Sequence, residues 1–294
     1  MRKQTLGRTG LVVTELGYGT GQLRGDRIWN GRSIQPEQAG RMLNMVLDSG
    51  INFIDTANVY GRAEDYIGQF ISQRRSEYYL ATKCGCQLVN MGDHDETPRN
   101  WTRAHLEESI HNSLKRMKTD YVDLLQFHNP TFDDLEKYDL VRVMEDARRA
   151  GKTRFVGIST TVPDLPRIRA LGVFDVFQIP YSALEREHEA WLQTVADAHI
   201  GTIIRGGVAK GAPAKTGSDL WEHARLDDLL DGMSRMDFML RFTLSHPAAH
   251  TTIVATINPD HLQDNLAAAE KGPLPIETYE EAKRRLSQAE QELT

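Results

Sequence analysis

Short apolar runs alternate with longer charged segments along most of this chain. The runs are rich in β-branched and aromatic residues, which is typical of buried strands in a parallel sheet. Eight runs predict strands: Thr14–Tyr18, Asn52–Ile54, Tyr78–Thr82, Val122–Phe127, Thr153–Ile158, Val176–Ile179, Gly201–Ile204 and Thr252–Val254. The intervening segments have helical periodicity. They predict helices at Gln35–Ser49, Thr102–Lys118, Asp133–Ala150, Asp164–Leu171, Glu187–Ala198, Asp237–Ser245 and Pro259–Ala269.

Three of these predicted helices have recognisable ends. Thr102 directly precedes a helical run and is expected to cap it. Gly151 follows two arginines and is expected to end a helix. Asn258 and Pro259 are expected to begin the last repeat, with proline in the first turn.

Eight strands that alternate with helices predict a parallel sheet with right-handed crossovers. That number of units favours a closed (β/α)8 barrel over the alternative, a doubly wound open sheet. Lys3–Leu6 and Leu11–Val13 predict a small hairpin that closes the bottom of the barrel. Glu277–Leu293 has few apolar residues and predicts a surface helix at the C-terminus. We therefore expect one barrel domain over residues 1–294.

Composition and charge narrow the class of protein. The 294 residues include 35 Lys and Arg against 41 Asp and Glu, for a net charge of −6. This balance argues against nucleic-acid binding, and 40% hydrophobic residues argue against a disordered chain. No run approaches the roughly 18 apolar residues of a membrane helix. We therefore expect a cytoplasmic enzyme that acts without a membrane or nucleic-acid partner.

Candidate chemistry follows three consecutive predicted strands. Asp55 and Tyr60 follow the second strand, Lys83 the third and His128 the fourth, at the barrel end where active sites lie. A lysine cation lowers the pKa of a nearby tyrosine, a carboxylate holds the lysine, and a histidine can hydrogen-bond a substrate oxygen. This set suits protonation of an oxyanion formed from a carbonyl. The hydride would then come from a nicotinamide cofactor.

Three motifs resemble signatures of the aldo-keto reductase family: Asn52–Gly61, Leu80–Cys84 and Asp120–His128. The resemblance extends from Thr5 to Asn265 in the family's order and spacing. It implies a (β/α)8 barrel with a bottom hairpin. It also implies an NAD(P)(H)-dependent oxidoreductase that interconverts aldehydes or ketones with alcohols.

The resemblance also implies a role for each residue of the candidate tetrad. Tyr60 would be the general acid, and Lys83 would depress its pKa. Asp55 would pair with Lys83, and His128 would orient the carbonyl. Nothing in the tetrad resembles a metal ligand set, so no metal site is expected.

By the same resemblance, several residues would hold the nicotinamide half of the cofactor. They are Gly19, Thr20, Ser159, Thr160 and Gln178, with Tyr181 stacked on the ring. Gly206, Gly207 and Gly211 would allow close approach of the pyrophosphate, with Arg205 or Lys210 on a phosphate. Ala212 stands where many relatives have a final lysine.

Cofactor preference depends on the segment after the last strand. Ile257 stands where many relatives carry the arginine that meets the 2′-phosphate of NADP. Asn258 and His261 would contact phosphate or ribose, and Asn265 would contact the adenine. NADP(H), the family's usual cofactor, is expected, and NAD(H) stays open.

Two other functional readings stay open. One is a sugar dehydrogenase that runs oxidatively with NAD or NADP, favoured by Ile257. The other is a regulatory subunit that holds the cofactor and turns over slowly, disfavoured because the chain starts directly at the hairpin. The substrate is expected to be a small carbonyl compound or a sugar. Its identity, the oligomeric state and the direction of reaction stay open.

The remaining motifs are interpreted as structural rather than catalytic. Cys84 and Cys86 are expected to be small buried residues rather than a soft-metal site. Asp93–Glu96 is expected to be a solvated loop near the substrate mouth. Trp101 and Trp221 are expected to line the substrate loops or to pack in the core.

Overall fold

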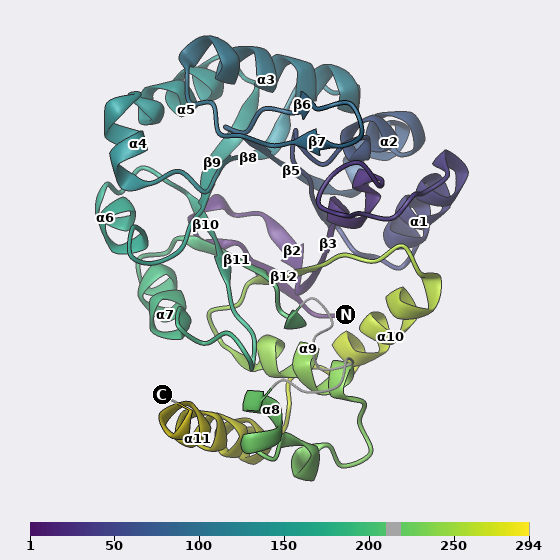
Figure 1. Ribbon diagram of the computed structural model, residues 1–294, viewed down its shortest axis with the longest axis vertical. Helices are drawn as coiled ribbons and strands as arrows, with labels where there is room; N and C mark the ends of the chain where they lie inside the picture. Colours follow the sequence, from purple (N-terminus) through teal and green to yellow (C-terminus); the bar gives the residue numbers. More distant parts are fainter. Residues whose placement is uncertain (210–218, 294) are drawn as a thin grey trace.

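The computed structural model describes residues 1–209 and 219–293 and contains a closed barrel of eight parallel strands (Figure 1). The strand order is β10-β11-β12-β3-β4-β5-β8-β9. Their bounds are Leu16–Gly19 (β3), Phe53–Asp55 (β4), Tyr79–Cys84 (β5), Val122–His128 (β8), Thr153–Ser159 (β9), Val176–Pro180 (β10), Gly201–Arg205 (β11) and Thr251–Val254 (β12). The predicted (β/α)8 barrel is confirmed. Seven of the eight strands extend slightly further toward their C-terminal ends than predicted, and β12 ends at Val254 as predicted.

A ring of helices covers the outside of the barrel (Figure 1). The ring comprises Pro36–Asp48 (α1), Ala63–Phe70 (α2), Arg103–Met117 (α3), Phe132–Lys137 (α4), Leu140–Arg149 (α5), Leu165–Ala170 (α6), Glu189–Asp197 (α7), Arg235–Ser245 (α9) and Pro259–Lys271 (α10). Among the described residues, none of the helices combines the length and the apolar character needed to cross a bilayer. The ring buries one face of each helix against the strands, as the amphipathic patterns predicted.

One helix prediction was wrong, and the helix α2 was missed. The helix expected over Asp133–Ala150 is two helices, α4 and α5, because Asp139 adopts a left-handed conformation with φ of 50°. The helix α2 was not predicted, because its charged first turn obscures a buried face formed by Tyr66 and Ile67.

The expected helix ends were confirmed at two of three positions. Gly151 follows α5 with φ of 73°, and Asn258 accepts a hydrogen bond from the Asp260 N–H at 3.0 Å. Thr102 precedes α3 but does not cap it through its side chain. Its hydroxyl donates to Asn100 Oδ1 at 2.7 Å instead.

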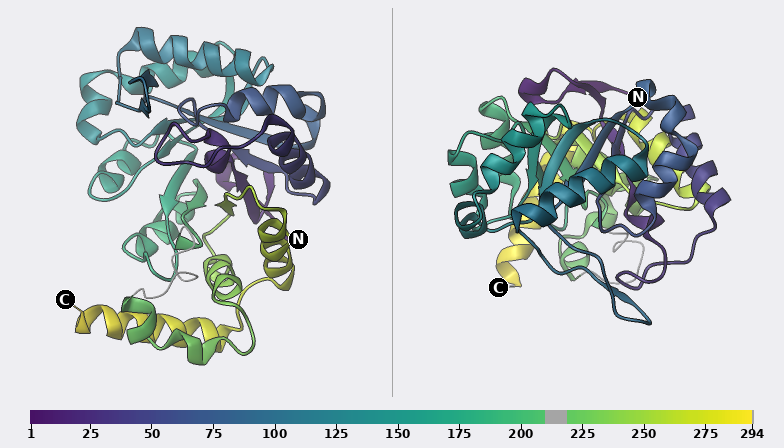
Figure 2. Two further views of the ribbon diagram at one scale, coloured as in Figure 1. Left: turned by 45° about the vertical axis from the view of Figure 1, so that its right-hand side comes forward. Right: turned by 90° about the horizontal axis from the view of Figure 1, so that it is seen from above.

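The N-terminal hairpin closes one end of the barrel, as predicted. Its strands are Lys3–Thr5 (β1) and Val12–Thr14 (β2), paired antiparallel. Gly7 lies so close to the barrel that a Cβ there would be 2.2 Å from the Gly201 nitrogen. In the right-hand view of Figure 2 the hairpin lies at one end of the barrel, and the loops near residue 90 lie at the other.

An apolar layer inside the barrel packs against this hairpin. It consists of Phe53, Ala81, Leu124, Val176 and Ile203, one from each of five strands, together with hairpin residues. Side chains two residues further along each strand point into the same interior. The residues of this apolar layer therefore identify which later side chains on each strand face the mouth at the other end of the barrel.

The C-terminal helix α11, Ile276–Glu292, is more closely packed than a free surface helix. Tyr279, Ala282, Leu286 and Ala289 are buried along one side of it. Figure 2, left, shows it lying across the edge of the molecule beside α8, Asp219–His223. The expected position was correct, but the helix also belongs to the core.

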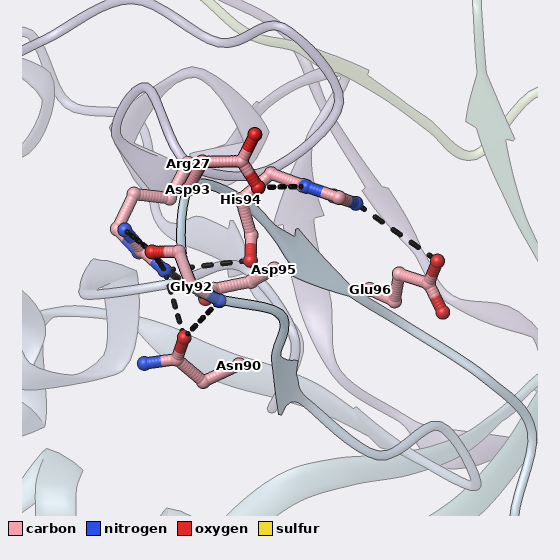
Figure 3. Close-up of polar contacts among 7 residues, drawn as sticks. All are labelled: Arg27, Asn90, Gly92, Asp93, His94, Asp95 and Glu96. Atoms are coloured by element: carbon pink, nitrogen blue, oxygen red, sulfur yellow. Dashed lines mark hydrogen bonds and ion pairs between the residues drawn. The ribbon is translucent and has the colours of Figure 1, made fainter.

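The segment expected as a solvated loop at Asp93–Glu96 contains a second small hairpin. Its strands are Val89–Asn90 (β6) and Asp95–Glu96 (β7). Arg27 fastens it with hydrogen bonds to Asp95, to the Asn90 side chain and to the Gly92 carbonyl (Figure 3). Those contacts come from a residue distant in sequence, so the local pattern did not reveal them.

Candidate active site

A polar layer lies directly above the apolar inner layer of the barrel. It consists of Asp55, Lys83, Gln126, Gln178 and Arg205, each two residues beyond a member of the apolar layer. The alternation of side chains along a strand points all five into the barrel mouth. Four of them are joined by hydrogen bonds, which confirms that direction.

The Lys83 ammonium and the Asp55 carboxylate form a buried ion pair, and each side chain is 1% exposed. Lys83 Nζ also donates to the Thr56 carbonyl at 3.0 Å. The second oxygen of Asp55 accepts from Gln126 Nε2 at 2.9 Å and Gln178 Nε2 at 3.0 Å. Further hydrogen bonds help offset the cost of burying a charge pair, and these three bonds do so here.

The charge of Lys83 is set by two opposing effects. Burial is the largest effect and lowers the pKa of Lys83, but the Asp55 charge, Tyr60 and the hydrogen bond to Asp55 together raise it more, so the net direction is upward. The side chain therefore stays cationic at neutral pH.

Tyr60 lies over this cation. It stands in the loop after β4, where its N–H donates to the Ala57 carbonyl at 3.0 Å. Lys83 Nζ is 5.3 Å from the centre of the Tyr60 ring, and the His128 ring is 6.0 Å from it, edge to face. The Tyr60 side chain is partly exposed, so a ligand can reach it.

His128 ends β8 beside Tyr60 and is neutral at physiological pH. Burial, followed by the positive charges of Lys83, Arg205 and Arg99, lowers the pKa of His128 to about 3. Its Nδ1 lies 3.9 Å from Cys86 Sγ. A neutral imidazole still offers one N–H donor to a ligand. The structure thus brings all four residues of the predicted tetrad together.

Several of the predicted nicotinamide contacts line the same mouth. Gly19 ends β3 and Thr20 follows it, and both are buried. Ser159 ends β9, and its hydroxyl donates to Asn129 Oδ1 at 2.9 Å. The Thr160 N–H donates to the Gln178 carbonyl at 3.1 Å, while the Gln178 side chain is committed to Asp55.

Tyr181 is not brought to this mouth. Its ring is fully buried 5.2 Å from His246 and 6.0 Å from Phe242, in the layer between the barrel and the outer helices. Its hydroxyl hydrogen-bonds to Tyr279 at 3.2 Å. The reason is register, because Tyr181 is three residues beyond the inward-facing Gln178 and so points outward. The expected stacking contact is therefore not formed in this arrangement.

The loop after β11 holds part of the predicted pyrophosphate contact. Gly207 is buried against β12, where a Cβ would be 2.6 Å from Thr252, so packing alone requires glycine there. Gly206 has φ of 74°. Arg205 points into the mouth with the polar layer rather than along this loop. Lys210, Gly211 and Ala212 lie outside the described residues.

The predicted contacts after β12 lie on the first turns of α10. Asn258 uses its side-chain oxygen to cap that helix. His261 is exposed, Asn265 is half-buried, and Ile257 packs at the edge of the core. Apolar Ile257 has no charge to offer a 2′-phosphate.

Buried polar atoms at the mouth fit a polar ligand. Thr20 Oγ1, Thr56 Oγ1, Gln126 Oε1 and Arg205 Nε have no hydrogen-bond partner within the described part of the chain. Such atoms are costly to leave unpaired, and a nucleotide amide, ribose or phosphate offers partners for them. In the same residues, no group of three His, Cys, Asp or Glu side chains is arranged to hold a metal ion.

Two residues of the mouth were missed by sequence reasoning. Gln126 is two residues before His128 on one strand, and this spacing was an available signal. Trp29 is 51% exposed with its ring 6.0 Å from Tyr60, and no local pattern indicated it. Trp101 and Trp221 are buried in the core instead. Cys84 and Cys86 are free and buried, as expected.

A family model described as the aldo/keto reductase family matches residues 15–285 of this chain. The barrel, the bottom hairpin and this match agree, and the protein belongs to the aldo-keto reductase family. With its oxidoreductase relatives, this makes the chain an oxidoreductase.

Individual relatives are similar to this chain over most or part of its length. The oxidoreductase YqkF of Bacillus subtilis is 28% identical over 318 aligned residues, covering 100% of this chain and 98% of the relative. The 6-dehydroglucose reductase of Novosphingobium aromaticivorans is 34% identical, covering 58% and 54%. The holo form of aldo-keto reductase AKR11C1 from Bacillus halodurans superposes with a TM-score of 0.84 at 26% identity, covering 97% and 96%.

Proposed function

We propose that this protein is an NAD(P)H-dependent oxidoreductase that interconverts aldehydes or ketones with alcohols, with Tyr60 as the proton donor. One observation carries the proposal. The buried Lys83 ammonium, held by Asp55, lies 5.3 Å from the ring of an accessible tyrosine beside a neutral histidine.

The proton step follows from this arrangement. As hydride reaches a carbonyl carbon, negative charge grows on the carbonyl oxygen, and Tyr60 donates its hydroxyl proton to that oxygen. The Lys83 charge stabilises the phenolate that remains. Asp55 fixes Lys83 in place, and the amides of Gln126 and Gln178 fix Asp55.

His128 positions the carbonyl. Because its pKa is depressed to about 3, the ring is neutral and donates one hydrogen bond without competing for the proton of Tyr60. Its neighbouring Cys86 faces Nδ1, which leaves Nε2 to face a substrate.

When bound, the nicotinamide cofactor supplies the hydride for this reaction. We infer that its nicotinamide end is held at the mouth by residues from three strand ends: Gly19, Thr20, Ser159, Thr160 and Arg205. Gly207, Asn258, His261 and Asn265 remain our candidates for the rest of the nucleotide. We propose NADP(H) as the cofactor, as is typical of the family.

A second candidate function is oxidation of a sugar with NAD. It is supported by Ile257, which offers no charge to the 2′-phosphate that distinguishes NADP from NAD. The similarity to a 6-dehydroglucose reductase is consistent with a hydroxylated carbonyl compound as the substrate in either direction.

The test begins with side-by-side calorimetric titrations of NADPH and NADH. Tighter NADPH leads to an assay of reduction with aldehydes, ketones and oxidised sugars, and turnover there supports the proposal. Tighter NADH with sugar oxidation favours the second candidate. Binding of neither cofactor overturns both.

A further inference from the structure

Arg205 is a cation inside the barrel mouth with an unsatisfied donor. It stands at the end of β11, two residues beyond Ile203 of the inner apolar layer, so its side chain points inward. Its Nε is buried and has no hydrogen-bond partner among residues 1–209 and 219–293. A buried, unpaired donor of this kind indicates that a bound group completes its surroundings.

Strand order places Arg205 across the mouth from the tetrad. In the closed order β10-β11-β12-β3-β4-β5-β8-β9, the strand opposite β11 is β5, which carries Lys83. Asp55 and His128 come from β4 and β8, the two neighbours of β5. The ligand space is therefore bounded by the tetrad on one wall and by Arg205 on the other.

The charge of Arg205 acts on that space. Burial lowers the pKa of Arg205 and Glu185 opposes the effect, but a guanidinium stays protonated at neutral pH. The positive charge of Arg205 interacts electrostatically with Tyr60, Lys83 and His128. Glu185 is exposed, so water screens its negative charge and it neutralises the positive charge of Arg205 only in part.

The proposed reaction puts the nicotinamide ring in this gap. A carbonyl held by Tyr60 and His128 receives hydride only from a ring in contact with it, and the wall opposite the tetrad is the one that Arg205 occupies. Tyr181, the expected neighbour of the ring, is buried in the outer core instead.

Resting on the proposed function, we propose that Arg205 faces the nicotinamide ring and makes the site discriminate between its redox states by charge. The reduced ring is neutral, whereas the oxidised ring carries a positive charge. Arg205 repels the oxidised ring across a region of low dielectric. The site therefore binds the reduced cofactor more tightly and releases the oxidised one readily, which suits carbonyl reduction.

The test compares dissociation constants of NADPH and NADP+, measured by calorimetry on the full-length chain. Arg205→Met removes the charge, Arg205→Lys retains it, and Glu185→Gln removes the opposing charge. We expect the ratio Kd(NADP+)/Kd(NADPH) to fall about tenfold in Arg205→Met. It should stay close to wild type in Arg205→Lys and rise by less than about twofold in Glu185→Gln, because water screens the Glu185 charge.

An Arg205 that only holds a phosphate gives a different result. Arg205→Met would then weaken both redox forms by the same factor, and the unchanged ratio would overturn the inference while leaving the proposed function intact. Circular dichroism checks the fold of each variant. If Arg205→Met does not fold, Arg205→Gln, which also removes the charge, takes its place, and an unchanged ratio in that variant overturns the inference. Failure of the wild type to bind either form overturns the proposed function itself.

Discussion

Arg27 and Asp95 join two loops at the barrel mouth, with Arg27 Nη2 2.7 Å from Asp95 Oδ1 (Figure 3). The contact is reciprocal, because the Asp95 N–H donates to the Arg27 carbonyl at 2.9 Å. Arg27 belongs to the loop after β3, and Asp95 belongs to the small hairpin after β5. Two residues beyond Arg27, the Trp29 ring meets Tyr60 edge to face at 6.0 Å. The pair therefore positions an aromatic side chain beside the proposed proton donor.

Arg27→Gln should loosen Trp29 without harming the fold. Because the Arg27 side chain is 41% exposed, its removal costs little stability. We expect a several-fold rise in KM for carbonyl substrates with an unchanged Kd for NADPH, measured by steady-state kinetics and calorimetry. Arg103→Gln, which breaks exposed ion pairs to Glu107 and Asp146, is the matched control and should leave KM unchanged. Equal KM values in both variants would show that the pair does not position Trp29.

Tyr60→Phe removes the proposed proton donor and retains the ring. General acid catalysis contributes about a hundredfold or more to rate, so kcat should fall by at least that factor. The Kd of NADPH should change little, because the substituted atom is only the hydroxyl. Tyr121→Phe, at an exposed tyrosine away from the mouth, controls for the loss of a phenol. Normal turnover in Tyr60→Phe would rule out the proposed proton donor.

Lys83→Met should damage stability as well as activity. It leaves the buried Asp55 carboxylate without its cation, which costs about 3–5 kcal/mol of unfolding free energy. Urea denaturation followed by circular dichroism measures this loss. The double variant Asp55→Asn, Lys83→Met removes both charges and should recover much of the stability but none of the turnover. A double variant no more stable than Lys83→Met would mean that the unpaired charge is not the cause.

The barrel and the tetrad were predictable because each depends on local patterns. The alternation of apolar runs and helical segments can be read from the sequence without knowledge of tertiary contacts. Asp55, Lys83 and His128 each end or nearly end a strand, and barrel strand ends converge. Gln126 was equally predictable, since it shares a strand face with His128.

Other features depended on contacts that no local pattern encodes. Tyr181 follows a strand that ends at Pro180, and a tyrosine there suits either a ligand pocket or a buried outer layer. Side chains alternate between the two faces of a strand, so the odd spacing between Gln178 and Tyr181 would have predicted that Tyr181 points outward. The position of Trp29 depends on the contact between Arg27 and the small hairpin β6–β7. Arg27 and Asp95 are separated by 68 positions in the sequence, so no local pattern reveals this contact.

The depressed pKa of His128 predicts a specific loss of stability in acid. In the unfolded chain a histidine takes up a proton near pH 6.5, whereas folded His128 does so only near pH 3. Between these values the unfolded state binds the extra proton, so unfolding free energy falls as pH falls, by up to about 1.4 kcal/mol per pH unit for this one group. His128→Gln should flatten the dependence by that slope, measured by urea denaturation from pH 7 to pH 4.

His111→Gln, at an exposed histidine on α3, is the control and should leave the slope as in the wild type. His246, whose pKa burial lowers to about 4, adds a parallel contribution in every variant, so a difference between the two histidine variants isolates His128. Identical slopes would show that His128 is not held neutral by its surroundings, and the proposed hydrogen bond to the carbonyl would lose its electrostatic basis.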